Sequence, residues 1–118
     1  MIKRISLIAA KPGLSKEEFT RHWRDIHGPL SLPVPKVVRY VQNHIVEEGA
    51  RHPHLPPAAT RIDGIVEFWF ESRADMEEAF ASPQAQALFA DGALFIESVT
   101  SFIVEEHVVI GEASPHAP

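Results

Sequence analysis

The chain contains no cysteine in its 118 residues, which excludes disulfide bonds, thiolate zinc sites and cysteine nucleophiles. It also lacks the run of about 18 apolar residues that a membrane-spanning helix needs. The first residues carry neither the long apolar stretch nor the cleavage site of a secretory signal. We therefore expect a cytoplasmic protein that has no membrane partner.

Basic residues are few, since 11 Lys and Arg stand against 16 Asp and Glu for a net charge of −5. They are scattered along the chain, whereas phosphate binding needs a basic patch or stripe. We therefore expect no nucleic-acid partner. The length suits one domain that buries roughly two-thirds of its unfolded surface. We place this domain at residues 1–110 and expect a disordered tail at 111–118.

Hydrophobic periodicity predicts four strands and two helical regions. Apolar and polar residues alternate, as strands require, over 2–11, 36–47, 62–71 and 99–109. Apolar residues recur at helical spacing between the first two strands and again between the last two. The segment 48–61 is rich in proline and has no periodicity, so we expect a loop. A loop of this length is uncommon unless it is functional or mobile, and closing over a pocket as a lid is one such role.

The first helix is predicted to begin at Ser15, because Glu18 three residues later completes a capping box. Gly28 and Pro29 are predicted to end it, which leaves His27 in the last helical turn. Its buried stripe is predicted at Phe19, Trp23, Ile26 and Leu30.

The second helical region is predicted to begin at Ser72, where Asp75 suggests another capping box. It restarts at Pro83, since proline suits the first helical turn, and we expect it to end at 91–92. Leu88 and Phe89 are its predicted buried positions.

The element order β-α-β-β-α-β is typical of an α+β, ferredoxin-like fold with a four-stranded antiparallel sheet. Right-handed crossovers place both helices on one face of that sheet. The strands are apolar or amphiphilic on both sides, so the uncovered face should pack on a second copy. We expect a homodimer whose two sheets form a dimeric α/β barrel.

Alternation assigns side chains to the two faces of the sheet. Val66, Phe68 and Phe70 are predicted to pack under the helices. The barrel interior is predicted to receive Ile65, Glu67 and Trp69, together with the polar set Tyr40, Gln42 and His44. We assign the polar set to the barrel interior because a helix–sheet core would require a hydrogen-bond partner for each of these groups.

The sequence resembles the EthD family of dimeric α/β barrels over nearly its whole length, from Ile2 to about Val109. The matching pieces are Phe19…His22-Trp23-Arg24…His27-Gly28-Pro29-Leu30, Tyr40-Val41-Gln42-Asn43-His44, Asp63-Gly64-Ile65…Glu67-Phe68-Trp69-Phe70, Ser82-Pro83…Ala87 and Phe102…Glu105-Glu106.

The resemblance implies a homodimer that acts on a small molecule and needs no metal or organic cofactor. The family includes isomerases, dehydratases and decarboxylases that use His, Tyr and acidic groups in the barrel pocket. We therefore expect a cofactor-independent enzyme that acts by proton transfer on a small oxygenated or aromatic-derived catabolite. Two alternatives stay open, namely a non-catalytic binding or accessory protein and an oxygenase of the dimeric α/β barrel type.

The candidate catalytic residues are His27, His44, Tyr40 and Glu67, and the candidate substrate-binding residues are Gln42, Trp69 and Phe102. The histidines would move protons, because a histidine pKa lies near neutrality. Tyr40 and Gln42 would hold a substrate oxygen, and Glu67 would tune a histidine.

Each candidate also has a plainer interpretation. His27 would bond the last helical carbonyls, and the strand-two polar set would make surface or interface hydrogen bonds. Glu67 would form an ion pair with Arg39. A five-residue spacing on an α-helix puts His22 and His27 on different sides, so we expect that they do not chelate one metal. His22 is expected to be structural and paired with Glu18. His52 and His54 lack a third ligand, so we expect no metal site.

Overall fold

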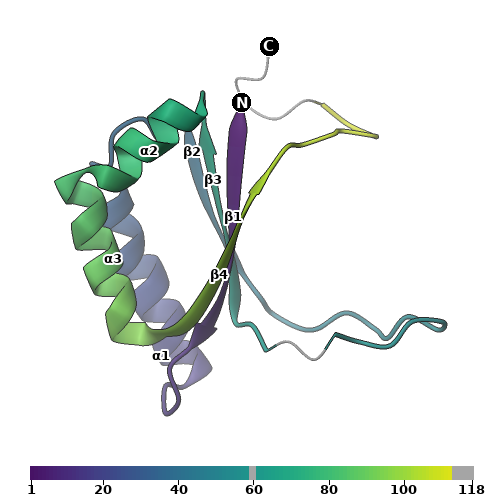
Figure 1. Ribbon diagram of the computed structural model, residues 1–118. Coiled ribbons are helices and arrows are strands. Elements are labelled where there is room, and N and C mark those ends of the chain that lie inside the picture. The colour runs from purple at the N-terminus through teal and green to yellow at the C-terminus, as the bar shows by residue number, and fades with distance from the viewer. Residues whose placement is uncertain (59–60, 113–118) are drawn as a thin grey trace.

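A computed structural model describes residues 1–58 and 61–112 of the chain. The predicted α+β, ferredoxin-like order is confirmed. The elements are β1 (Ile2–Ala10), α1 (Lys16–Arg21), η1 (His22–His27), η2 (Gly28–Ser31), β2 (Arg39–His44), β3 (Gly64–Phe70), α2 (Arg73–Ala81), α3 (Pro83–Phe95) and β4 (Ile96–Val104). The sheet is antiparallel with the strand order β2-β3-β1-β4, and the helices all cover one of its faces (Figure 1).

The strand boundaries differ from those predicted by a few residues. β2 begins at Arg39, later than expected, because Lys36 has a φ of 68° and interrupts the extended backbone. β4 begins at Ile96, earlier than expected, because its first residue pairs with Ala10 of β1. The predicted tail lies, from residue 113 onward, outside the described residues.

Serine caps begin the helices as predicted. The Ser15 hydroxyl accepts a hydrogen bond from the Glu18 N–H at 3.1 Å, and the Glu18 carboxylate accepts one from the Ser15 N–H at 3.2 Å. Ser72 and Ser82 cap α2 and α3 through their hydroxyls alone, so the capping box predicted at Ser72 and Asp75 is only half formed. The expected helix end at 91–92 is wrong, since α3 continues to Phe95. Gly92 is buried in this helix against His27, so here glycine allows close packing and does not end the helix.

The first helix changes from α to π geometry at His22, and this change shifts its buried face. In η1 the Gly28 N–H donates to the Trp23 carbonyl, five residues earlier. The wider turn buries His27 and leaves Ile26 53% exposed, so the predicted stripe is wrong at Ile26. π-helical turns are rare and are found frequently at functional sites.

The core lies between the helices and one face of the sheet. Trp23 is fully buried there, and an added Cβ on Gly64 would lie 2.5 Å from its ring. The core contains, as predicted, Val66, Phe68 and Phe70 from β3, and it also contains Phe19, Met76, Ala79, Leu88 and Phe95 from the helices. Phe89, which was predicted to be buried, is instead 41% exposed.

The opposite face of the sheet carries no helix. Register places Ile5, Glu67 and Val41 in one row across this open face, with Phe102 opposite Ile5. The described part of the loop after β2 extends away from the helices, on the open side (Figure 1). None of the helices in the described residues is long and apolar enough to cross a membrane.

Candidate functional site

The polar residues of β2 face the helices, which corrects their predicted place in the barrel interior. Tyr40 is paired with Phe68, Gln42 with Val66 and His44 with Gly64. Residues directly opposite each other in an antiparallel sheet share a face. The Tyr40 ring accordingly stacks on Phe68, with centroids 4.7 Å apart. The prediction failed because it assumed that these polar groups would lack partners in the helix–sheet layer.

Gln42 supplies those partners. Its Nε2 donates to the Trp23 carbonyl at 2.8 Å and to the Tyr40 hydroxyl at 2.9 Å, while its Oε1 lies 2.8 Å from His44 Nε2. A carbonyl can only accept, so the amide nitrogen must face Trp23 and the amide oxygen must face His44. His44 Nε2 therefore carries a proton. Tyr40 accepts from Gln42, which leaves its own hydroxyl proton free to donate.

A second polar cluster joins η1 to α3. His27 Nδ1 lies 2.8 Å from Asp91 Oδ2, and His22 Nε2 lies 3.1 Å from both oxygens of the same carboxylate. One π-helical turn spans five residues, so it brings His22 and His27 to the same side. The predicted separation of the two histidines assumed α geometry and is wrong. The expected partner of His22 is also wrong, because Glu18 is occupied by the cap of α1.

Asp91 fixes the proton position on His27. A carboxylate accepts hydrogen bonds, so His27 Nδ1 carries the proton and Nε2 keeps a lone pair when the ring is neutral. Burial lowers the pKa of His27 below its ordinary value of 6.5, against the opposing influence of Asp91. His27 is thus a neutral imidazole at neutral pH, with one nitrogen held and the other available as a base.

His27 and Tyr40 line the same cavity, which lies between the sheet and α3. Its volume is about 400 Å³, within the range of small-molecule sites. Its walls are largely apolar and include Phe68 and Leu88, while Arg4 and Ser6 enter from β1. Burial raises the pKa of Tyr40 above 10.0, although the hydrogen bond from Gln42 opposes this, so the phenol stays protonated.

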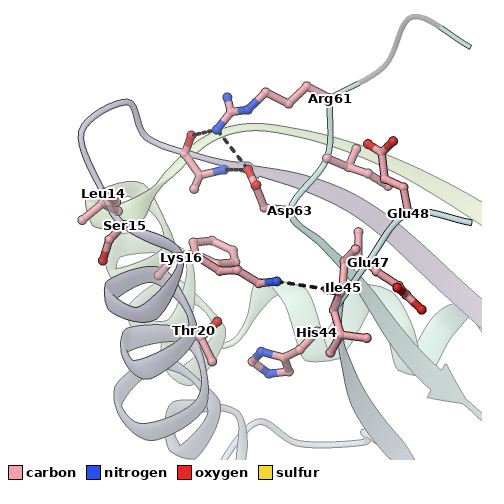
Figure 2. A pocket seen from close by; sticks show the side chains of 14 residues that line it. Leu14, Ser15, Lys16, Thr20, His44, Ile45, Glu47, Glu48, Arg61 and Asp63 are labelled. Carbon is pink, nitrogen blue, oxygen red and sulfur yellow. Dashed lines mark hydrogen bonds and ion pairs between the residues drawn. The ribbon is translucent and has the colours of Figure 1, made fainter.

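A smaller cavity of about 280 Å³ lies between α1 and the ends of β2 and β3 (Figure 2). His44 lies at this cavity, and the cavity of His27 does not include it. Three of the charged groups here already have protein partners, since Lys16 Nζ donates to the Val46 carbonyl at 3.3 Å and Arg61 pairs with Asp63 at 3.1 Å (Figure 2). The structure therefore places His44 at a different cavity from His27 and Tyr40, although Gln42 links His44 to Tyr40 by hydrogen bonds.

Three other predicted site residues lie on the open face of the sheet. Glu67 pairs with Lys3 Nζ at 3.3 Å, which differs from the expected pairing with Arg39. The Trp69 indole donates to the Glu106 carboxylate at 2.6 Å, and Phe102 lies opposite Ile5. None of the three lines the cavity of His27 and Tyr40.

Sequence reasoning missed Asp91 because it treated the Asp-Gly pair as a helix end. The available signal was that a carboxylate in the second helical region could meet the histidine-rich first helix, since both were expected on the same face of the sheet. Within residues 1–58 and 61–112, no group of three or more His, Asp or Glu side chains is arranged to hold a metal ion. His52 and His54 contact each other in the loop, where the His54 N–H donates to His52 Nδ1 at 3.0 Å.

Two proteins of related sequence are similar to this chain over most of its length. An uncharacterized 11.0 kDa protein in the thcB-thcC intergenic region of Rhodococcus erythropolis is 31% identical over 93 residues, which cover 78% of this chain and 84% of that protein. The 4-carboxymethyl-4-methylbutenolide mutase of Pseudomonas reinekei is 28% identical over 109 residues, which cover 92% of this chain and 100% of the mutase.

Solved structures show the same fold. An ethyl tert-butyl ether degradation (EthD) family protein from Bacillus halodurans has a TM-score of 0.71 and 22% identity, with 91% of this chain and 99% of that chain covered. A dimeric ferredoxin-like protein of unknown function from Thermobifida fusca has a TM-score of 0.65 and 14% identity, with 87% and 88% covered. Residues 11–98 match the EthD domain, and the chain therefore belongs to the EthD family.

Proposed function

We propose that this protein is a small catabolic enzyme that isomerises an unsaturated lactone or a related oxygenated compound by proton transfer. The observation that carries the proposal is that a neutral His27, held at Nδ1 by Asp91, shares one cavity with the protonated Tyr40. Groups with shifted pKa values that converge in a cavity are typical of catalytic sites. The similarity to a butenolide mutase favours isomerisation over the dehydration and decarboxylation that the sequence left open.

The proposed reaction begins when His27 Nε2 removes a proton from a carbon next to the substrate carbonyl. The electrons of the broken C–H bond form a C=C bond as the neighbouring ring C–O bond breaks, and the Tyr40 hydroxyl stabilises the carboxylate that is released by hydrogen bonding. The ring closes again when a carboxylate adds to a different alkene carbon, and the protonated His27, paired with Asp91, returns the proton to the carbon beside it. The atoms and charge of the substrate are unchanged overall, as an isomerisation requires.

The test is the conversion of 4-carboxymethyl-4-methylbutenolide, followed by proton NMR, in the wild type and in His27→Gln. Removing a general base costs about 10²- to 10⁴-fold in turnover. His22→Gln is the matched control, since His22 contacts the same carboxylate but does not line the cavity, and it should lose less than about tenfold. Turnover that survives His27→Gln would exclude His27 as the base.

Binding without conversion is the outcome that favours the alternative, a non-catalytic ligand-binding protein. In that case the wild type would hold the butenolide in the cavity, and His27→Gln would change its affinity without any product in either protein. Screening further lactones and carbonyl compounds for exchange of carbon-bound hydrogen separates this outcome from a wrong choice of substrate.

We also propose that two copies pack through their open faces as a homodimer. Phe102 is 50% exposed on this face, and Ile5, Leu7 and Ile65 lie beside it in register. Contiguous apolar surfaces of this kind are uncommon on monomers. The similar Thermobifida fusca protein is dimeric, which supports the proposal.

A further inference from the structure

Arg4, the third residue of β1, lines the cavity. Register places it on the helix side of the sheet, opposite Phe68 and Ile103. Its guanidinium lies over the Phe80 ring at 4.4 Å from the centroid, and its Nη2 donates to the Ser101 hydroxyl at 3.2 Å. The side chain is therefore held in one place by an aromatic ring and a hydroxyl.

Arg4 forms no ion pair with a carboxylate of the described residues. Glu97 lines the same cavity, but its Oε2 lies 3.6 Å from Arg61 Nη1, and it sits at the start of β4, far along the strand from Ile103. A half-buried cation in an apolar wall is costly unless something compensates its charge. Burial accordingly lowers the pKa of Arg4 below its ordinary value.

We propose that Arg4 anchors the carboxylate of an acidic ligand, with the Ser6 and Ser101 hydroxyls beside it. This inference rests on the proposed function, which places the reaction at His27 and Tyr40. It adds that the substrate is a small carboxylic acid. The two hydroxyl oxygens lie 2.8 Å apart, so they form a polar pair, of which Ser6 lines the cavity. A guanidinium matches a carboxylate through two parallel N–H donors.

The spacing suits a ligand that reaches from the anchor to the reacting groups. Tyr40, Phe68 and Arg4 form one row across three adjacent strands. Strands lie about 4.8 Å apart, so the backbones of Arg4 and Tyr40 are roughly 10 Å apart, and their side chains converge on one cavity. A ligand whose carboxylate binds Arg4 would place a carbonyl group, a few bonds away in the same molecule, near the Tyr40 hydroxyl.

The charge of the cavity favours a monoanion over a phosphate ester. Arg4 is the sole Lys or Arg among the described residues that line it, and the one carboxylate in the lining, Glu97, is paired with Arg61 at 3.6 Å. His27 adds no positive charge at neutral pH, because burial lowers its pKa. One guanidinium and two hydroxyls match the single charge of a carboxylate, whereas a dianion would be left partly uncompensated.

The test compares a carboxylate with its neutral isostere by calorimetric titration, using phenylacetate and phenylacetamide as probes. We expect the wild type to bind phenylacetate at least about tenfold more tightly, as a charge-assisted pair in a cavity allows. Arg4→Met keeps the apolar stem on Phe80 and removes the charge. It should abolish the preference while retaining phenylacetamide binding, which shows that the cavity is intact.

Arg73→Met is the matched control, because Arg73 is exposed at the start of α2 and lies outside the cavity. It should keep the full preference. Arg4→Lys keeps the charge but loses the paired donors, so it should retain only part of the preference. If Arg4→Met does not fold, Arg4→Lys is the variant whose preference is compared with that of the wild type.

A wild type without any preference for phenylacetate, including one that does not bind it, would overturn the proposal. A preference that survives Arg4→Met would overturn it as well. The titration measures binding alone and needs no turnover, so its result does not depend on whether the butenolide is converted. Failure of the proposed reaction and failure of the carboxylate anchor are therefore distinguished.

Discussion

Asp91 Oδ2 lies 2.8 Å from His27 Nδ1, across the junction between η1 and α3. This contact exists because the π-helical turn brings His27 inward and because α3 continues past residues 91–92. It fixes which nitrogen of His27 is protonated and opposes the effect of burial on the pKa of that ring. The proposed chemistry depends on this pair.

Asp91→Asn should lower the pKa of His27 further. The carboxylate raises this pKa through a hydrogen bond and through its charge, so its removal leaves burial unopposed. NMR titration of the His27 ring protons, with His22→Gln as control, measures the shift. A pKa that rises or stays constant in Asp91→Asn would contradict the assigned role of this carboxylate.

Turnover should increase with pH and level off, with a midpoint below 6.5. The base must be neutral to accept a proton, and burial lowers the pKa of His27 from 6.5. The pH profile of kcat/KM reports this midpoint in the free enzyme. A rate that falls as pH rises through this range would require a protonated His27 instead.

The free energy of unfolding should fall as the solution is acidified below about pH 6.5. The unfolded His27 binds a proton more readily than the folded one, so the unfolded state gains protons first and is favoured at low pH. Urea unfolding of the wild type and His27→Gln at several pH values measures this dependence. The slope should be smaller in the variant, and equal slopes would remove His27 from the acid sensitivity.

Gly64→Ala should destabilise the protein by about 1–3 kcal/mol, because the core around Trp23 has no room for a methyl group. The added Cβ would lie 2.5 Å from two atoms of the Trp23 ring. Gly49→Ala is the matched control, since a Cβ at Gly49 meets nothing within 4 Å. Urea unfolding curves of both variants give the comparison. Equal midpoints would show that Trp23 can shift freely.

Phe102→Asp should convert the proposed dimer into a monomer without altering the cavity. Phe102 lies on the open face, so a buried charge there opposes association of two copies. Leu94→Asp is the control, because Leu94 is exposed on α3 in the helix layer. Sedimentation analysis gives the masses. A wild type that sediments as a monomer would contradict the dimer.

The fold could be predicted from local signals. Each of these signals lies within a short segment, and short segments determine helix caps and strand faces. They are the pairs Ser15 with Glu18 and Ser82 with Pro83, and the alternation of Val66, Phe68 and Phe70. The overall order of elements then follows from connection rules.

The candidate site could be predicted only in part, because it depends on contacts between distant segments. His27 and Tyr40 do share a cavity, but Asp91 became visible only once α3 was placed against η1. The polar residues of β2 were assigned to the wrong face because Gln42 satisfies them within the helix–sheet layer. A change from α to π geometry leaves no clear periodic signal, so the partners of His22 could not be anticipated.

The most direct test of the central claim is hydrogen exchange into 4-carboxymethyl-4-methylbutenolide in D₂O, followed by NMR in the wild type and in His27→Gln. We expect the wild type to incorporate deuterium at the carboxymethyl CH₂, the saturated carbon next to a carbonyl in this compound. We expect His27→Gln to slow this exchange by about 10²-fold or more. Exchange at the wild-type rate in His27→Gln would contradict the assignment of His27 as the base.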